Sequence, residues 1–351
     1  MKQPLKSKCK LPIKLKINDI YYNYNKYYSY DDLFLALIDG GRGIGKTTSF
    51  IIRGLKDAEE GYEFIYLRRY KPEIKKFVNK DSFSPIIDGI IYRGDGTGGY
   101  TIFYEKKQLG YLISLSTARS YKSTDFSKVS LIIFDEGFVH QTSSYRYLQD
   151  EIIQFLEFVS TVVRTRKNVR VVILGNHEDM FSPYHSYFNI PSFKGVYIDK
   201  EHGIYCEHAV NSPKLLEMER ETGLHKLIKD TEYGGYHYDN ETLGTGEVKI
   251  REQRPTNLRF LFRLVVNKNM IILSAFEEKN EIYLYCEHRE KLIRDKYTYE
   301  LIDNAKINYL NVEIYKKRFK NYIYNFYFND RIYYDSKKGG SVLAWVVENI
   351  S

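Results

Sequence analysis

The chain has 351 residues, of which 53 are Lys or Arg and 45 are Asp or Glu, so its formal net charge is +8. Hydrophobic residues make up 43% and charged residues 28%, which is typical of globular rather than disordered chains. The length exceeds that of one usual compact core and predicts two domains. No apolar run approaches the roughly 18 residues that a membrane helix needs, so we expect no contact with a membrane.

The positive charge is concentrated in a basic N-terminal arm, residues 1–30. This arm holds seven lysines and one acid, Asp19, and carries +6 of the total. Two interpretations remain open: the arm binds a polyanion, or its lysines only keep it soluble. No apolar segment follows the first lysines, which argues against a secretory signal. The cysteines, Cys9, Cys206 and Cys286, are far apart, which predicts a reducing compartment without disulfides or a zinc site.

From residue 31 to about residue 208, short apolar runs alternate with stretches of helical periodicity. The runs are mostly continuous, as in strands buried on both faces of a parallel sheet. We therefore predict a doubly wound α/β domain over 31–208. The predicted strands are Leu33–Ile38, Phe64–Leu67, Tyr111–Leu115, Leu131–Phe134 and Val169–Leu174, and the predicted helices are 46–59, 72–79 and 145–163.

The pattern changes in the C-terminal part of the chain. Ser212–Pro213 is typical of a helix start and opens a short helical linker region, 209–255. A smaller α+β domain is predicted over 256–351. Its predicted elements are the strands Phe260–Val266, Met270–Phe276 and Ile282–Cys286, a helix near 298–325, and a last apolar run, Val342–Val347, expected to be a buried strand.

One glycine-rich segment matches the phosphate-loop pattern G-x-x-x-x-G-K-[ST] between a predicted strand and a predicted helix. Its glycines let backbone N–H groups surround phosphate oxygens, and the helix N-terminus adds partial positive charge. The lysine is expected to reach the β- and γ-phosphates of a nucleotide, and the first threonine to bind Mg²⁺. The residues expected to bind nucleotide are Gly40, Gly41, Arg42, Gly43, Ile44, Gly45, Lys46, Thr47 and Thr48.

A second motif is the apolar run Leu131–Phe134 followed by Asp135 and Glu136. Ligands of open α/β sheets bind at the carboxyl ends of the strands, so Asp135 is predicted to hold Mg²⁺. Glu136 is placed to orient and deprotonate an attacking water. Another strand lies between the phosphate loop and this acid pair, which favours an ASCE-type P-loop ATPase over a kinase or a GTPase. The predicted reaction is therefore ATP hydrolysis.

Three further polar residues remain open between a functional and a structural interpretation. Asn176 follows the strand Val169–Leu174, where a polar side chain can contact the γ-phosphate; it is also a common turn residue. Arg164 and Arg166 follow a predicted helix. Arginines there usually interact with the helix dipole, but one at a domain edge can also enter a neighbour's active site.

A basic cluster begins at Arg68 and includes Arg69, Tyr70 and Lys71. Clustered cations with an interleaved aromatic residue suit a nucleic-acid backbone, so Arg69 and Lys71 are candidate DNA contacts. The alternative is a solvated helix face.

Together these motifs resemble the DNA-packaging ATPases of short-tailed, protein-primed double-stranded DNA phages, the phi29-like family. The resemblance runs in family order over about residues 30–290. It rests on the segments 41–46, 64–73, 133–136, 163–166 and 230–234, of which Arg-Arg-Tyr-Lys-Pro-Glu at 68–73 is the most specific.

The resemblance implies a homopentameric ring that docks on the portal of an empty capsid and uses ATP and Mg²⁺. It implies that Arg164 is a trans-acting arginine finger, that Lys122 is a further trans-acting cation and that Lys71 contacts DNA from the pore. It also implies an RNase H-like C-terminal domain that has lost its nuclease acids. In this sequence Asp303, Asp330 and Asp335 are scattered and form no acid pair at the end of a strand, which argues against nuclease activity. Some family members need a phage structural RNA.

We therefore expect an ATP-driven double-stranded DNA translocase that packages a phage genome in the host cytoplasm. Two alternatives remain. One is a headful-type terminase large subunit with an active nuclease, and the other is a P-loop ring ATPase that acts on protein, as in secretion or extrusion.

Overall fold

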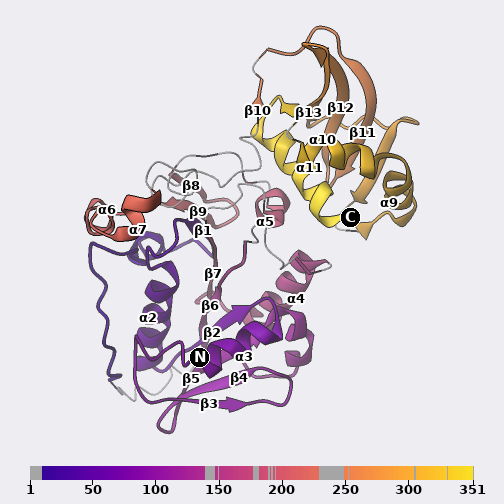
Figure 1. Ribbon diagram of the computed structural model, residues 1–351. Coiled ribbons are helices and arrows are strands. Elements are labelled where there is room, and N and C mark those ends of the chain that lie inside the picture. Colours follow the sequence, from indigo (N-terminus) through magenta and orange to yellow (C-terminus); the bar gives the residue numbers. More distant parts are fainter. Residues whose placement is uncertain are drawn as a thin grey trace. The chain divides into compact units, whose positions relative to one another are not determined.

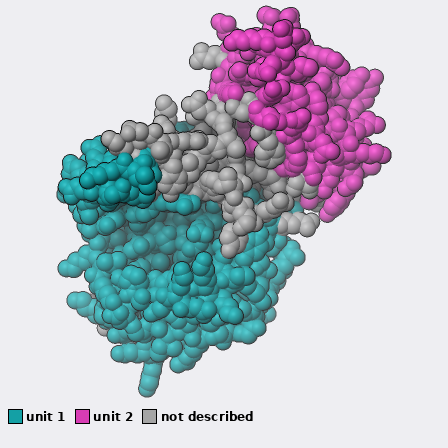
Figure 2. Space-filling model, viewed as in Figure 1, with its two compact units in different colours: residues 1–178, 193–242 teal, residues 179–192, 243–351 magenta. Residues whose placement is uncertain are grey.

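The structure, a computed structural model, describes residues 10–138, 147–148, 150–176, 182–188, 190, 193, 195–228, 249–251, 253–303, 306–329 and 331–350 (Figure 1). The chain forms two compact units, one of residues 1–178 and 193–242 and the other of residues 179–192 and 243–351 (Figure 2). Over the described residues, no helix is both long enough and apolar enough to cross a membrane.

The first unit is built on a mainly parallel sheet. In its described part the strand order is β3-β4-β5-β2-β6-β7-β1-β9-β8. Neighbours from β5 to β9 pair in parallel, whereas β3, β4 and β8 add antiparallel edges. The strands are β1 (Leu35–Gly40), β2 (Glu63–Arg68), β3 (Ile90–Gly94), β4 (Tyr100–Tyr104), β5 (Lys107–Ser114), β6 (Val129–Phe134), β7 (Arg170–Leu174), β8 (Val196–Asp199) and β9 (Ile204–Ala209).

Helices cover both faces of this sheet, which is why β1 and β6 are buried at every residue. On one face, Ile133 of β6 joins a core with α2 (Lys46–Glu59) and α3 (Lys71–Asn79). Its neighbour Phe134 points to the other face and stacks on Phe155 of α4 (Glu151–Val163). The other helices in the described part of this unit are α1 (Asn25–Tyr28), the 3₁₀ helix η1 (Leu115–Tyr121), α6 (Pro213–Arg220) and α7 (Gly223–Ile228).

The strands and helices predicted between residues 33 and 176 are present, and the mixed α/β class is confirmed with them, but the helix predicted over 145–163 begins only at Glu151. The edge strands β3, β4 and β8 were not predicted. Their residues are only partly buried and lack the continuous apolar runs of the central strands.

Residues 10–30 are not only a solvated basic arm, which was one of the two interpretations of this segment. Leu11, Tyr22, Tyr24 and Tyr27 are buried in the core of the first unit. Tyr22 also donates a hydrogen bond from its hydroxyl to the buried carboxylate of Glu207 at 2.7 Å. The apolar residues between the lysines therefore attach this segment to the core of the first unit, while residues 1–9 lie outside the described residues.

The second unit holds another sheet, whose order in the described chain is β10-β16-β13-β12-β11-β14-β15. Strands β11, β12 and β13 form an antiparallel meander, and β14 pairs in parallel with β11. The elements found among the described residues of this unit are α5 (Pro183–Tyr187), β10 (Lys249–Ile250), β11 (Arg259–Val266), β12 (Asn269–Glu278), β13 (Glu281–Arg289), β14 (Thr298–Asp303), β15 (Lys306–Ile307), α9 (Tyr309–Tyr315), the π helix η2 (Lys316–Lys320), α10 (Asn321–Phe328), β16 (Ile332–Tyr334) and α11 (Lys337–Asn349).

Two predictions for this unit are wrong. The helix expected near 298–325 begins instead with strand β14, which completes the backbone hydrogen bonds of β11. The apolar run Val342–Val347 lies on helix α11 and not on a strand. A short apolar run does not distinguish a buried strand from a buried helix, and here the Ser336 hydroxyl caps the helix by accepting from Gly339 N at 3.2 Å.

Candidate active site

The phosphate-loop sequence connects β1 directly to α2, as the motif predicts. Gly40, Gly43 and Gly45 have φ values of 145°, 78° and 87°, which side chains other than glycine rarely adopt. A Cβ atom on Gly40 would lie 2.1 Å from the carbonyl oxygen of Ala209 in β9. Glycine is therefore required at this position both by the turn and by the close approach of the neighbouring strand.

Lys46 is buried, and its ammonium group lies inside the loop. It donates hydrogen bonds to the carbonyl oxygens of Gly40 at 2.9 Å and of Gly41 at 2.8 Å. Ile44 is also buried and accepts a hydrogen bond from Tyr22 N at 2.7 Å, whereas Arg42 is exposed. The Lys46 ammonium group thus lies beside the positive N-terminal end of the α2 dipole. This arrangement favours the binding of an anionic ligand.

The hydroxyl of Thr47 and the carboxylate of Asp135 meet at the carboxyl edge of the sheet. Thr47 Oγ1 donates to Asp135 Oδ1 at 2.8 Å, although 88 residues separate the two. Asp135 is 5% exposed and directly follows β6. These two oxygen ligands are of the type that Mg²⁺ prefers, so the residues fit the ion that the motif implies.

Glu136, the next residue, has a backbone φ of 54°, in the left-handed region that non-glycine residues seldom adopt. Its side chain is 60% exposed, in contrast to that of Asp135. The turn after β6 thus directs one carboxylate into the protein and the other toward solvent at the same edge.

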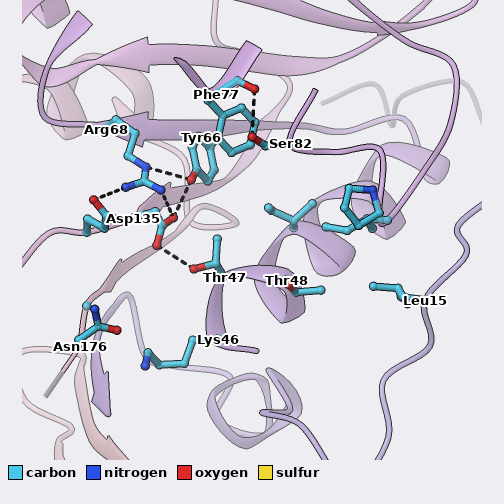
Figure 3. A pocket seen from close by; sticks show the side chains of 15 residues that line it. Leu15, Lys46, Thr47, Thr48, Tyr66, Arg68, Phe77, Ser82, Asp135 and Asn176 are labelled. Carbon is cyan, nitrogen blue, oxygen red and sulfur yellow. Dashed lines mark hydrogen bonds and ion pairs between the residues drawn. The ribbon is translucent and has the colours of Figure 1, made fainter. Parts of the chain in front are cut away.

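Arg68 and Tyr66 of β2 complete this edge (Figure 3). Arg68 was considered only as part of the basic cluster, and Tyr66 was not singled out from the sequence. Arg68 forms ion pairs with Asp135 Oδ2 at 2.8 Å and with Glu136 Oε2 at 2.6 Å. It also donates to the Tyr66 hydroxyl at 3.0 Å, and that hydroxyl donates to Asp135 Oδ2 at 2.6 Å. The guanidinium thus holds both carboxylates of the motif at once.

Burial shapes the protonation of these two β2 side chains. Burial, followed by the negative charge of Asp135, raises the pKa of Tyr66 well above its usual value, so the phenol stays a hydrogen-bond donor. Burial by itself lowers the pKa of the Arg68 guanidinium. The negative charge of Asp135, followed by Tyr66 and Glu136, outweighs this effect and raises the pKa well above its usual value. Arg68 therefore remains a cation at the site.

A cavity of about 370 Å³ opens at this edge (Figure 3). Asn176 follows β7 and lines the cavity together with Thr48 and Glu136, so the structure brings these predicted residues together. The neighbouring Gly175 N donates to Ile38 O of β1 at 3.1 Å, which holds the Asn176 turn against the start of the phosphate loop. The lining residues are Leu15, Lys46, Thr47, Thr48, Ile51, Tyr66, Arg68, Phe77, Ser82, Pro85, Ile86, Asp135, Glu136, Gly175 and Asn176.

The two arginines after α4 have different environments. Arg166 donates from its guanidinium to the carbonyl oxygens of Ser127, Val129 and Val162, so it fastens the end of the helix to the start of β6. Arg164 caps the helix with a φ of 51°, and its side chain is exposed. Of the two, Arg166 therefore makes the side-chain contacts expected of a structural arginine.

Arg164 lies near the amino-terminal end of β6, whereas Asp135 lies at its carboxyl-terminal end. Arg166, two residues on, contacts the first residue of β6, whereas Asp135 follows the last. Six residues of extended strand span about 20 Å, so Arg164 does not reach the acid pair of its own subunit. Lys122, which follows η1, is exposed and lies outside the cavity of its own subunit.

The two candidate DNA contacts also differ. Arg69 is 3% exposed and forms an ion pair with the buried Glu151, with Nε to Oε2 at 2.7 Å. It donates in addition to the backbone oxygens of Glu136 at 3.0 Å and Gly137 at 2.8 Å. This differs from the expected surface contact, because the guanidinium is occupied by buried acceptors that link β2 to the turn after β6.

Lys71, by contrast, is exposed at the start of α3. Its side chain passes over Gly98 in the turn between β3 and β4, where a Cβ atom would lie 2.6 Å from Lys71 Cε. The helix start is fixed by Glu73, whose carboxylate accepts from Tyr70 N at 2.7 Å. Lys71 is therefore a positioned surface cation two residues after the buried Arg69.

Comparison with known proteins identifies sequence relatives over most of the chain. The family model described as Podovirus DNA encapsidation protein (Gp16) matches residues 17–339. The DNA packaging protein of Bacillus phage phi29 is 31% identical over 273 residues, which cover 76% of this chain and 79% of that protein. The DNA packaging protein of Bacillus phage B103 is 31% identical over 297 residues, covering 83% and 88%.

Two solved structures resemble the whole chain. The structure titled "The Phi-28 gp11 DNA packaging Motor" has a TM-score of 0.65 at 16% identity, covering 95% of this chain and 99% of that chain, which is a likeness of fold. The bacteriophage Phi-29 viral genome packaging motor assembly has a TM-score of 0.58 at 25% identity, covering 95% and 100%.

Proposed function

This chain belongs to the Podovirus DNA encapsidation protein (Gp16) family, and we propose that it hydrolyses ATP to drive double-stranded DNA into a procapsid. The observation that carries the ATPase assignment is the Thr47–Asp135 hydrogen bond, which joins the phosphate loop to the acid at the end of β6. The names of the relatives, DNA packaging proteins of Bacillus phages, support DNA as the substrate that is moved.

The proposed chemistry divides among the residues at the carboxyl edge. The phosphate loop and Lys46 bind the phosphates, and Asn176, which lines the same cavity, is proposed to contact the γ-phosphate. Thr47 and Asp135 would hold Mg²⁺, which supplies charge neutralisation for the phosphoryl oxygens. Glu136 accepts the proton of the attacking water.

Arg68 constrains when Glu136 can act. Glu136 Oε2 lies 2.6 Å from the Arg68 guanidinium, which also forms an ion pair with Asp135. We propose that the Glu136 carboxylate turns away from Arg68 when it contacts the attacking water. The Arg69 contacts to the Glu136 and Gly137 backbone tie this same turn to the segment that carries Lys71.

We further propose that the subunits act as a homomeric ring, pentameric as the family resemblance implies, on the capsid portal in the host cytoplasm. The position of Arg164 at the opposite sheet edge supports this, since only a neighbouring subunit can receive its side chain in a site. Lys122 is proposed as a second cation of the same interface, and Lys71 as the DNA contact. A phage structural RNA remains an optional partner of the ring.

For the second unit we propose an RNase H-like fold without nuclease activity. Its meander β11–β13 with β14 parallel to β11 supports the fold. Among the described residues, no group of three or more His, Cys, Asp or Glu side chains could hold a metal ion. Glu300 and Asp335 are instead paired with Arg294 and Arg289. Of the acids considered from the sequence, Asp330 and the side chain of Asp303 lie outside the described residues.

The decisive experiment measures ATP turnover of the full chain alone, with double-stranded DNA, and with DNA plus the phage portal. Turnover should rise with DNA and rise again with the portal. A rate that is indifferent to DNA but increases with an unfolded protein substrate would favour the protein-directed ring ATPase instead. Cleavage of plasmid by the chain with a divalent metal ion would restore the nuclease alternative.

A further inference from the structure

The glycine-rich turn between β3 and β4, residues 95–99, lies against the side chain of Lys71 (Figure 1). A Cβ atom on Gly98 of this turn would lie 2.6 Å from Lys71 Cε and 3.1 Å from Lys71 Nζ. The end of the lysine side chain therefore runs directly over the Gly98 backbone. A change in the shape of the turn would displace the ammonium group.

Asp95 fixes the shape of this turn. Its Oδ1 atom accepts hydrogen bonds from Thr97 N at 2.9 Å and from Gly99 N at 3.1 Å. Thr97 Oγ1 lies 2.8 Å from the same carboxylate oxygen, and Asp95 N donates to Gly99 O at 3.1 Å. The carboxylate thus holds the backbone on which Lys71 lies in one conformation.

Tyr121, the last residue of η1, attaches the turn to the rest of the first unit. Its hydroxyl donates to Asp95 Oδ2, and the hydroxyl oxygen lies 2.6 Å from Thr97 Oγ1. Tyr121 is buried, and a Cβ atom on Gly99 would lie 2.1 Å from its hydroxyl oxygen, so this group is packed against the turn. Burial, followed by the hydrogen bond to Asp95, raises the pKa of Tyr121 above its usual value, so the phenol remains a donor.

The same helix leads directly into Lys122, which is exposed and follows Tyr121 in the chain. At the other end of η1, Ser116 N donates to Arg69 O at 3.1 Å, two residues before Lys71. Helix η1 is therefore held at both ends by the segments that carry and support Lys71. These contacts fix the backbone of Lys122 relative to that of Lys71.

We propose that the Tyr121 hydroxyl is a positioning group that links the DNA contact Lys71 to the interface cation Lys122. This inference rests on the proposed function, because that function assigns those roles to the two lysines. DNA that binds Lys71 presses on the turn at Gly98, and the Asp95–Tyr121 hydrogen bond joins that turn to the residue before Lys122. Tyr121 contacts neither DNA nor nucleotide in this role, and it acts through the two lysines.

The variant Tyr121→Phe tests the first half of this link, because it removes one hydroxyl and no charge. The affinity of double-stranded DNA for the full chain is measured over a range of salt concentrations. The slope of log K against log salt reports the number of phosphate contacts, so a substitution that removes no charge changes it only by displacing a cation.

Tyr121→Phe should reduce this slope by about 0.5–0.9, close to the effect of losing one phosphate contact in Lys71→Ala. The combined variant should show no further reduction, because both substitutions act on the same contact. Thr97→Val removes the other hydroxyl at this contact, again without a change in charge, and should reproduce the smaller slope.

The second half of the link is tested by ATP turnover at saturating DNA with the portal present. Tyr121→Phe should lower the stimulation by DNA at least about 5-fold, the lower end of the usual coupling between two sites. Tyr92→Phe is the matched control. The Tyr92 hydroxyl on β3 donates to Asp81 Oδ1 at 2.8 Å, so this variant loses the same kind of hydrogen bond from the same hairpin, outside the turn. It should leave the salt slope and the stimulation unchanged.

The outcomes separate this inference from the proposed function. A smaller slope in Lys71→Ala with an unaltered slope in both Tyr121→Phe and Thr97→Val would overturn the positioning role alone. Undiminished stimulation in Tyr121→Phe, or an equal loss in Tyr92→Phe, would overturn the link to Lys122. An unaltered slope in Lys71→Ala itself would overturn the proposed DNA contact, and the inference with it.

Discussion

Thr47 Oγ1 lies 2.8 Å from Asp135 Oδ1, so the first turn of α2 and the end of β6 share a hydrogen bond. We expect Thr47→Val to reduce Mg²⁺-dependent ATP turnover by at least about 100-fold, because the variant loses an oxygen ligand without changing the volume greatly. Thr47→Ser keeps the hydroxyl and serves as the matched control. Steady-state turnover over a Mg²⁺ titration measures the effect, and full activity of Thr47→Val would contradict the metal assignment.

Glu136→Gln should bind ATP with nearly unchanged affinity but lose turnover by a factor of about 10²–10⁴, the usual contribution of a general base. The amide keeps the size of the side chain and cannot accept the proton. Equilibrium nucleotide binding and single-turnover hydrolysis separate the two effects. Turnover at the normal rate would reject Glu136 as the base.

Arg164 and Arg166 provide a matched pair for the proposed subunit interface. Arg164→Ala should leave the stability of the chain unchanged, because its side chain is exposed, and should abolish DNA-stimulated turnover. Arg166→Ala should lower the free energy of unfolding by about 1–3 kcal/mol, since it leaves carbonyl oxygens of Ser127, Val129 and Val162 without their donor.

Mixing experiments test whether Arg164 acts in a neighbour. Arg164→Ala subunits mixed with Glu136→Gln subunits should recover part of the turnover at interfaces that join an intact Glu136 to an intact Arg164. The ratio of the two variants is varied at constant total protein. If no ratio restores turnover, Arg164 does not act across subunits.

Lys71→Ala should weaken DNA binding and reduce the slope of log K against log salt by about 0.9, as expected for one lost phosphate contact. Lys76, an exposed lysine on the same helix, provides the control Lys76→Ala. Basal ATP turnover should stay unchanged in both variants. An unaltered salt slope in Lys71→Ala would reject the contact.

Arg69→Ala should instead destabilise the first unit. It leaves the carboxylate of Glu151, itself 3% exposed, without its cation, and breaking such a buried pair costs about 3–5 kcal/mol. Chemical denaturation measures this loss. If the Arg69→Ala chain were as stable as the unmodified chain but bound DNA more weakly, Arg69 would have to be assigned as a DNA contact.

The second unit should lose stability as the pH falls through the ordinary pKa of histidine, near 6.5. Burial, and then the charge of Lys338, lowers the pKa of His288 below 6.5, while Asp335 and Glu290 oppose this. The unfolded chain therefore binds the proton more readily than the folded one, and protonation favours unfolding. Thermal unfolding between pH 8 and pH 5.5 should show a smaller decrease for His288→Gln than for the unmodified chain.

Those parts of the candidate site that are formed by consecutive residues could be predicted from the sequence. The phosphate loop from Gly40 to Thr47 depends on local backbone conformation and on the strand and helix next to it. The position of Asp135 follows from the strand that precedes it. Such features were predictable because the physical cause lies within a few residues of its effect.

The tertiary structure alone decided which side chains meet across strands. The pairing of β2 with β6 brings Arg68 to Asp135 and Glu136, and the same pairing buries Arg69 against Glu151 while leaving Lys71 exposed. The bridge from Ile13 to Ile87 likewise makes Leu15 a wall of the cavity. These contacts depend on strand order and register. Local hydrophobic patterns do not specify either, because every buried parallel strand presents the same continuous apolar run.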